Sequence, residues 1–95
     1  MTDTAGRAAA TANICNSRGL HARASAKFVK LASGFDAEVR VTRDGVTVNA
    51  LSIMGLLMLG AGNGCDVHIE AEGADAPAAV AALADLVNRR FDEDQ

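Results

Sequence analysis

Residues 36–48, DAEVRVTRDGVTV, give the clearest indication of the fold. Apolar and polar residues alternate from 36 to 42 and again from 46 to 48, which is typical of strands with one buried face. The dipeptide Asp44-Gly45 between them favours a tight turn, because both residue types tolerate a positive φ angle. The stretch therefore predicts a β-hairpin with one face toward a core.

Two other segments alternate in the same way, one near each end of the chain. Residues 8–15 predict a weak strand, and residues 66–72, DVHIEAE, predict a clear strand that ends at Gly73. In the second strand His68 faces outward, and we interpret it as a solvated sheet residue. The inward faces are predicted to be Ala10, Ala12 and Ile14 in the first strand, and Val67, Ile69 and Ala71 in the second.

Three segments predict helices. The first spans residues 22–33, the second is capped by Ser52 and ends near Leu59, and the third is capped by Asp75. The buried row of the first helix is predicted to be Ala22, Ala26 and Val29, with Phe28 and Ala32 beside it. The buried row of the last helix is predicted to be Val80, Leu83, Leu86, Val87 and Phe91. Beyond that helix we expect residues 92–94 to fray.

The predicted order of elements is β-α-β-β-α-β-α, and each strand has one polar face. A sheet of this kind leaves one face in water and covers the other with helices. We predict an α+β fold, an open-faced two-layer sandwich in which a four-stranded antiparallel sheet is covered on one face by three helices. The domain is expected to span residues 8–91, between a disordered leader at 1–7 and an acidic tail at 92–95.

Composition and charge argue against several classes of function. At 95 residues and 49% hydrophobic content, the chain is a single globular domain. A net charge of −3 and the absence of Trp and Tyr argue against nucleic-acid binding. No apolar run has the length of a membrane span, and the first residues lack the apolar core of a signal peptide. Cys15 and Cys65 share no metal-type spacing with either histidine, so we expect no metal site and two reduced thiols in the cytoplasm.

Residues 16–23, NSRGLHAR, carry most of the functional information. They place His21 where an extended run gives way to a helix, with Arg23 two residues later. The first N–H groups of a helix have no intrahelical partner, and the macrodipole makes that end partly positive, so anions bind there. The segment predicts a histidine that can accept a phosphoryl group. The alternative is a capping or surface histidine with no covalent chemistry.

Together with a second segment, these residues resemble HPr, the histidine-containing phosphocarrier family of the bacterial phosphotransferase system. Residues 19–23, GLHAR, resemble the active-site loop of that family, and residues 48–56, VNALSIMGL, resemble its regulatory-serine segment. From Asp66 onward the chain fits the family in spacing and pattern. Ala24 stands where the family usually has proline, and Ala50-Leu51 where it usually has Gly-Lys. Because alanine only restores an N–H in the first turn, we expect the site to survive.

The resemblance implies a role in phosphoryl transfer. His21 would accept a phosphoryl group from enzyme I and donate it to an enzyme II A-type domain in sugar transport. The N–H groups of Ala22 and Arg23, with the Arg23 guanidinium, would bind the phosphoryl oxygens. The chain would be a monomeric carrier that turns nothing over itself and needs no cofactor.

Ser52 and the helix that follows it have two interpretations. A serine that opens a helix is an N-cap worth about 1 kcal/mol. The resemblance implies that it is also phosphorylated by an HPr kinase/phosphorylase in some bacteria, and a phosphate is compatible with a helix N-terminus. The short helix has more apolar residues than one buried stripe needs, which predicts a docking surface. The candidate docking residues are Ala22, Ile53, Met54 and Leu57, whereas Leu56 and Leu59 are predicted to be core.

Two alternatives to a carrier stay open. A regulatory HPr-like module would signal by phosphorylation-dependent binding to a kinase or a transcription factor, and both roles can coexist in one protein. A small phosphohistidine enzyme would need a general acid and a substrate pocket, and the sequence shows neither a suitable carboxylate cluster nor a second histidine nearby. The glycine-rich residues 60–64 lack the Lys-Ser/Thr that completes a P-loop.

Overall fold

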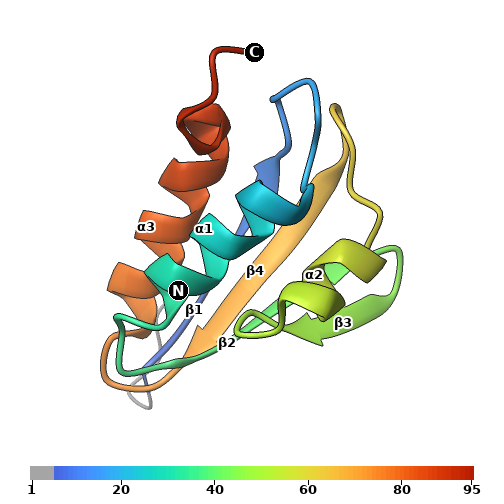
Figure 1. Cartoon of the computed structure of the whole chain (residues 1–95). Coiled ribbons are helices and arrows are strands. Elements are labelled where there is room, and N and C mark those ends of the chain that lie inside the picture. The colour runs from blue at the N-terminus through green and yellow to red at the C-terminus, as the bar shows by residue number, and fades with distance from the viewer. Residues whose placement is uncertain (1–5) are drawn as a thin grey trace.

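The computed structural model describes residues 6–95, and within them a four-stranded sheet is covered by helices on one side (Figure 1). In chain order the elements are β1 (Arg7–Asn13), α1 (Ala22–Ala32), β2 (Glu38–Arg43), β3 (Val46–Asn49), α2 (Ile53–Met58), β4 (Asp66–Glu72), α3 (Ala76–Asn88) and a short 3-10 turn, η1 (Arg90–Asp92). Each predicted strand and helix is present. Of the predicted leader, residues 1–5 lie outside the described residues, and Arg7 belongs to β1. None of the helices in the described part of the chain is both long and apolar enough to cross a membrane.

All strands pair antiparallel, in the order β1-β4-β2-β3. β4 is therefore an inner strand, and its Ile69 lies opposite Ala10 of β1 on one side and Val41 of β2 on the other. β2 continues into β3 through Asp44 and Gly45, whose φ angles of 50° and 78° are the positive values that a tight hairpin turn requires. The predicted α+β class and open-faced sandwich are confirmed.

The two faces of the sheet differ as predicted. Val41, Val67 and Ile69 are at most 2% exposed and belong to one hydrophobic cluster with the inner faces of α1 and α3. On the open face, charged side chains pair across strands, as Arg40 does with Glu72 at 2.9 Å. Burial of one face and solvation of the other fixes the register, because a shift of one residue would exchange the two faces.

α1 buries a different row of residues from the one predicted. Ala22 and Ala26 are exposed, and the buried residues are Ala24, Ser25, Phe28 and Ala32. The basic residues Arg23, Lys27 and Lys30 lie along the opposite side of the helix, so that side faces solvent, and Phe28, the largest apolar side chain of the helix, is 1% exposed on the buried side. The buried Ser25 hydroxyl is satisfied by donation to the Leu20 carbonyl at 3.2 Å.

α3 also begins and ends differently from the prediction. Asp75 is its N-cap residue, but the Asp75 carboxylate accepts from the Asp36 N–H at 2.8 Å instead of capping the helix. Beyond α3, the three residues of η1 have φ angles between 54° and 61°, and the side chain of Phe91 at their centre is fully buried. This left-handed turn redirects the chain toward the loop between β1 and α1, where Gln95 contacts Ser17 (Figure 1).

We expect Gly19→Ala to destabilise the protein more than Gly45→Ala does. Both glycines have positive φ angles, of 67° and 78°, so alanine costs about 1–2 kcal/mol of backbone strain at either position. At Gly19 the added Cβ would also lie 2.6 Å from the Ala61 carbonyl oxygen, whereas at Gly45 it would meet no atom within 4 Å. Urea unfolding of the two variants measures the difference, and equal losses of stability would contradict this account.

Candidate functional site

The loop from β1 to α1 is fixed in place by backbone contacts. The Leu20 N–H donates to the Ala61 carbonyl at 2.8 Å, and the Leu20 side chain is 7% exposed. Gly19, with its positive φ angle, allows the backbone to pass against the Ala61 carbonyl. His21 therefore follows a well-anchored segment, although it lies in a loop.

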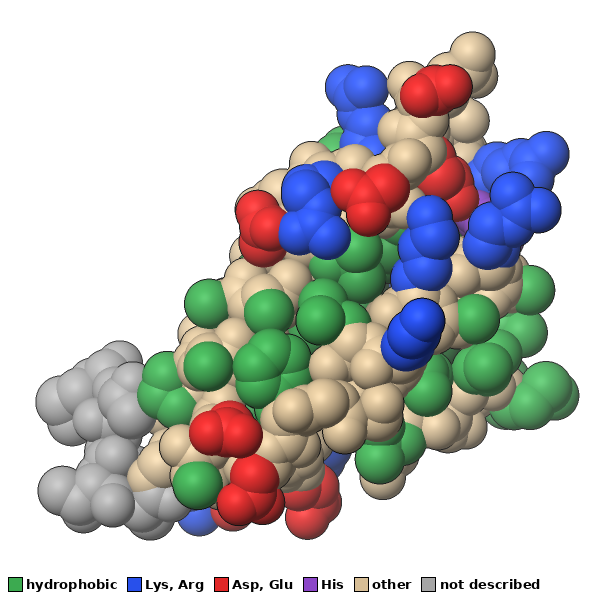
Figure 2. Space-filling view, turned by 60° about the vertical axis from the view of Figure 1, so that its left-hand side comes forward, with side chains coloured by type: hydrophobic (Ala, Val, Ile, Leu, Met, Phe, Trp, Pro, Cys, Tyr) green, Lys and Arg blue, Asp and Glu red, His purple; other side chains and the backbone are tan. Residues whose placement is uncertain are grey.

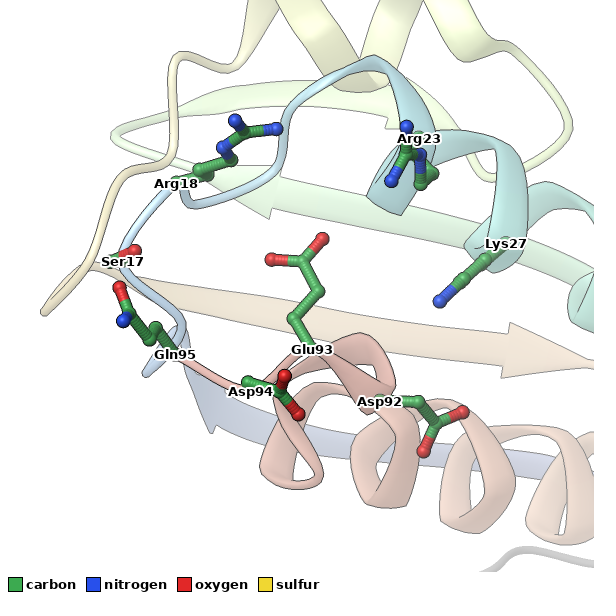
Figure 3. Close-up of a pocket in the computed structure, with 8 residues that line it drawn as sticks. All are labelled: Ser17, Arg18, Arg23, Lys27, Asp92, Glu93, Asp94 and Gln95. Atoms are coloured by element: carbon green, nitrogen blue, oxygen red, sulfur yellow. The ribbon is translucent and has the colours of Figure 1, made fainter.

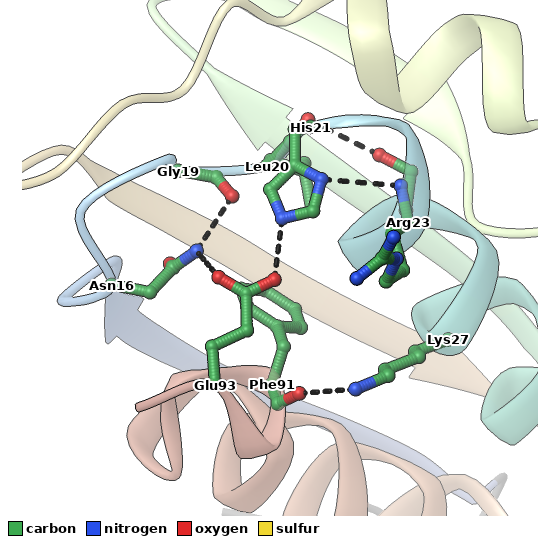
Figure 4. Close-up of polar contacts among 9 residues, drawn as sticks. Asn16, Gly19, Leu20, His21, Arg23, Lys27, Phe91 and Glu93 are labelled. Atoms are coloured by element: carbon green, nitrogen blue, oxygen red, sulfur yellow. Dashed lines mark hydrogen bonds and ion pairs between the residues drawn. The ribbon is translucent and has the colours of Figure 1, made fainter. Parts of the chain in front are cut away.

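His21 is the N-cap residue of α1, as the sequence predicts. Its backbone is extended, with φ −75° and ψ −178°, and its Nδ1 accepts from the Arg23 N–H at 3.2 Å (Figure 4). Its side chain is 21% exposed, so the ring is neither sequestered in the core nor turned away from the helix. The nitrogen Nδ1 lies at the partly positive end of the helix, where the first N–H groups have no intrahelical acceptor.

The other ring nitrogen contacts a carboxylate from the far end of the chain. His21 Nε2 pairs with Glu93 Oε2, and the second carboxylate oxygen of Glu93 accepts from Asn16 Nδ2 at 2.9 Å (Figure 4). Asn16 is fully buried, and its Nδ2 also donates to the Gly19 carbonyl at 2.8 Å. The prediction that residues 92–94 fray is wrong at Glu93, whose side chain contacts His21 and Asn16 of the loop between β1 and α1.

Contacts of the neighbouring residues explain why this terminal segment is ordered. Phe91 is fully buried, and its carbonyl accepts from Lys27 Nζ at 2.7 Å. Further along, the Gln95 carbonyl accepts from the Ser17 N–H at 3.1 Å. An apolar anchor and two hydrogen bonds to the α1 side of the molecule thus hold the segment on either side of Glu93.

Charged side chains of both signs line this part of the molecule. A pocket of about 520 Å³ opens beside His21, and Glu93 projects into it between cations from the loop and from α1 (Figure 3). On the molecular surface, Lys and Arg side chains gather beside a histidine, next to an area of hydrophobic side chains (Figure 2). The residues that line the pocket are Ser17, Arg18, Arg23, Lys27, Asp92, Glu93, Asp94 and Gln95. The pocket can accommodate a small anion.

The environment of Glu93 favours its ionised form. Burial raises the pKa of the Glu93 carboxyl, but hydrogen bonds from Asn16 and His21, together with the nearby positive charge of Lys27, lower that pKa further than burial raises it. The net result is a pKa below the ordinary value, so the group is a carboxylate at neutral pH.

The second predicted segment lies on α2. Ser52 is its N-cap, and the Ser52 hydroxyl accepts from the Gly55 N–H at 2.9 Å. Leu56 and Leu59 are buried, as predicted. Several large apolar side chains remain exposed: Ile53 at 40%, Met54 at 69%, Leu57 at 36% and Met58 at 77%. Ala22, at the start of the neighbouring α1, is exposed too.

His68 lies on the opposite, open face of the sheet. It is exposed beside Thr11, as predicted.

Sequence reasoning missed two residues of this site. Asn16 stands in the recognised segment but had no role assigned, and Glu93 was placed in a frayed end. The available signal was weak: Phe91, an apolar residue past the end of the helical pattern, indicates that the chain is anchored again before it ends. No local pattern indicates which of the last carboxylates reaches the histidine.

Comparisons with known proteins agree on one family. A family model described as "PTS HPr component phosphorylation site" matches residues 8–89. The phosphocarrier protein HPr of Neisseria meningitidis serogroup A is 51% identical over 80 residues, which cover 84% of this chain and 90% of that protein. The crystal structure of HPr-C-His from Thermoanaerobacter tengcongensis superposes with a TM-score of 0.88 at 43% identity and covers 93% of this chain and 99% of its own. An HPr dimer from the same bacterium gives a TM-score of 0.73 at 46% identity and covers 85% of this chain and 93% of its own.

We expect the stability contributed by Glu93 to be lost at acid pH. The folded protein lowers the pKa of this carboxyl, so the contribution is complete above the unfolded value of about 4.3 and disappears as the pH falls through the lower folded value. Urea unfolding of the wild type and of Glu93→Gln should therefore give free energies that differ near neutral pH and converge as the pH falls below the folded pKa of Glu93. Asp94→Asn, which removes a charge from the same segment, controls for the change in net charge. A difference that does not change with pH would contradict the role of the ionised carboxylate.

Proposed function

The chain belongs to the HPr family of phosphocarrier proteins of the phosphotransferase system, and from that premise we propose that His21 carries the phosphoryl group. It would accept the group from enzyme I and donate it to an enzyme II A-type domain. One observation carries this proposal: the His21 side chain is partly exposed, and its Nδ1 lies at the first N–H groups of α1. The protein would act as a substrate of two other enzymes and would catalyse no turnover itself.

The geometry supports attack by Nδ1. A neutral imidazole has one nitrogen with a free lone pair. When the new bond to phosphorus forms, the Arg23 N–H that now donates to Nδ1 becomes available to a phosphoryl oxygen. The N–H of Ala22 and the guanidinium of Arg23 would bind the other oxygens, and each hydrogen bond to a charged group contributes about 1.5–3 kcal/mol.

The exposed apolar face of α2 supports a role in docking. We propose that Ile53, Met54 and Leu57, with Ala22 of α1, form the contact surface for the phosphotransferase partners. Exposed apolar patches of this kind mark protein interfaces, and methionine adapts to partners of different shape.

Because one face would serve successive partners, we propose that the protein acts as a monomer. The free thiols of Cys15 and Cys65 support a reducing compartment, the cytoplasm.

Ser52 would be a regulatory phosphorylation site, read by an HPr kinase/phosphorylase. It opens α2 directly before the proposed docking residues, and its side chain is partly accessible. A phosphate there would carry about −1.5 to −2 charges and could accept from the first N–H groups of α2, so the fold would tolerate it. Partners that dock through an acidic surface would be repelled.

We expect His21→Ala to lose all phosphorylation by phosphoenolpyruvate and enzyme I, because the variant lacks the imidazole nitrogen that would accept the phosphoryl group. The measurement is incorporation of acid-labile phosphate into the purified variant. His68→Ala is the matched control, since His68 is the other histidine of the chain and lies exposed on the open sheet face. Acid-labile phosphate on His21→Ala at the wild-type level would refute the assignment.

We expect Ser52→Asp to keep the fold and to slow phosphorylation of His21 by enzyme I, because a negative charge would enter the docking surface. Ser52→Ala serves as the control: it loses the cap bond to Gly55, worth about 1 kcal/mol, but adds no charge. Initial rates of phosphorylation at several enzyme I concentrations would show the effect as a raised KM. Equal KM values for the two variants would exclude a charge effect at Ser52.

A further inference from the structure

We propose that Glu93 is a positioning residue for phosphoryl transfer, which holds the proton of His21 on Nε2 and thereby keeps the lone pair on Nδ1. This inference rests on the proposed function of His21 and extends it to the other end of the chain. Asn16 acts indirectly, because its hydrogen bond holds the Glu93 carboxylate in place.

The two contacts of the ring specify the same tautomer independently. An ionised carboxylate only accepts hydrogen bonds, so Nε2 must donate to Glu93. A backbone N–H only donates, so Nδ1 must accept from Arg23. A neutral imidazole has two tautomers, and only the one with the proton on Nε2 and the lone pair on Nδ1 satisfies both partners. In the other tautomer both contacts would be broken.

Asn16 is built into the protein to hold the carboxylate. The Asn16 side chain is fully buried. Its Nδ2 donates to the Gly19 carbonyl and to the Glu93 carboxylate. Because both of these groups only accept hydrogen bonds, the amide must be oriented with Nδ2 toward them. This orientation leaves the buried Asn16 Oδ1 without a hydrogen-bond partner among the described residues. An unsatisfied buried acceptor destabilises the folded protein, because it has lost its hydrogen bonds to water. A buried amide kept at this cost indicates that its two donated bonds matter.

The backbone after α3 carries strain that brings Glu93 to the ring. Arg90, Phe91 and Asp92 all have φ angles near 60°, although none is glycine. This conformation is unfavourable for residues other than glycine, and it persists where surrounding contacts hold it. Those contacts are the buried Phe91 side chain and the bond from Lys27 to the Phe91 carbonyl. Without the turn, the chain would continue along the α3 axis and Glu93 would not face His21.

This arrangement lets phosphoryl transfer proceed without moving the ring proton. The Nδ1 lone pair forms the bond to phosphorus, and the bond from phosphorus to the donor atom breaks, with its electron pair staying on the donor. The proton remains on Nε2, so the phosphorylated ring gains a positive charge, which the Glu93 carboxylate balances. In the onward step the acceptor forms the new bond to phosphorus, and the P–N electrons return to Nδ1. The ring then leaves as neutral imidazole, a far better leaving group than an imidazolide anion.

The decisive experiment compares Glu93→Gln with Asp94→Asn. Asp94 lines the same pocket and makes no hydrogen bond or ion pair within the described residues, so its variant removes the same charge without touching the ring. In Glu93→Gln, the side-chain oxygen must face the Asn16 donor, which turns the amide NH₂ toward Nε2 and disfavours the proton there. Both sites lie at the end of the chain, outside the strands and helices, so both variants should fold.

The first readout is the tautomer of His21, measured at neutral pH by ¹⁵N chemical shifts of histidine-labelled, unphosphorylated protein. We expect the Nε2–H form in the wild type and in Asp94→Asn, and a mixture of tautomers in Glu93→Gln. The second readout is the rate of phosphorylation by enzyme I, which should fall about 10- to 100-fold in Glu93→Gln alone, as misplacement of a reacting group does.

Three outcomes would overturn the proposal: an unchanged tautomer in Glu93→Gln, an altered tautomer with an unchanged rate, or equal effects of Asp94→Asn. The tautomer measurement requires no phosphoryl transfer, so its result stands even if labelling of His21→Ala disproves the carrier function.

Discussion

The His21 ring is held between a helix start and a carboxylate, and the chemistry of the site depends on that double contact. Arg23 donates to one ring nitrogen, and Glu93 accepts from the other. The lone pair that would attack phosphorus therefore already lies at the N–H groups that would receive the developing negative charge. Dipoles oriented before the reaction cost no reorganisation when charge develops, which makes them the most effective source of electrostatic stabilisation.

The order of the strands explains why two distant parts of the chain meet at this ring. β1 pairs with β4, and α3 packs across both strands, so the end of α3 lies beside the loop that follows β1. The remaining distance is bridged by the left-handed turn at 90–92. The buried side chain of Phe91 belongs to the hydrophobic core and yet stands two residues before Glu93. Core packing and site geometry are thus coupled through one short segment.

The sequence predicted those features whose causes are local. β4 has its predicted bounds, because valine, isoleucine and alanine alternate there with charged residues and no other pattern competes. The positions of His21 and Ser52 as helix caps were also predictable, since a cap bond joins residues two or three positions apart. The buried face of α1 was not predicted, because alanines occur on both sides of that helix. The contact of Glu93 was not predictable either, since it joins residues 72 positions apart and depends on three positive φ angles that residue propensities disfavour.

The charge balance of the pocket is suited to a protein that must release what it binds. Arg18, Arg23 and Lys27 would attract a phosphoryl group, and unit charges 4 Å apart interact by about 4 kcal/mol at the effective dielectric constant near a protein surface. Three unopposed cations would therefore retain a dianion strongly. Asp92 and Asp94 also line the pocket, and Glu93 offsets part of this attraction because its carboxylate lies among the same cations. The Glu93 carboxylate would also stabilise the positive charge that phosphorylation places on the ring. It would therefore favour the charged imidazole and, at the same time, weaken the attraction between the cations and the phosphoryl oxygens. A carrier needs that combination, since a group bound too tightly at His21 would not reach the next acceptor.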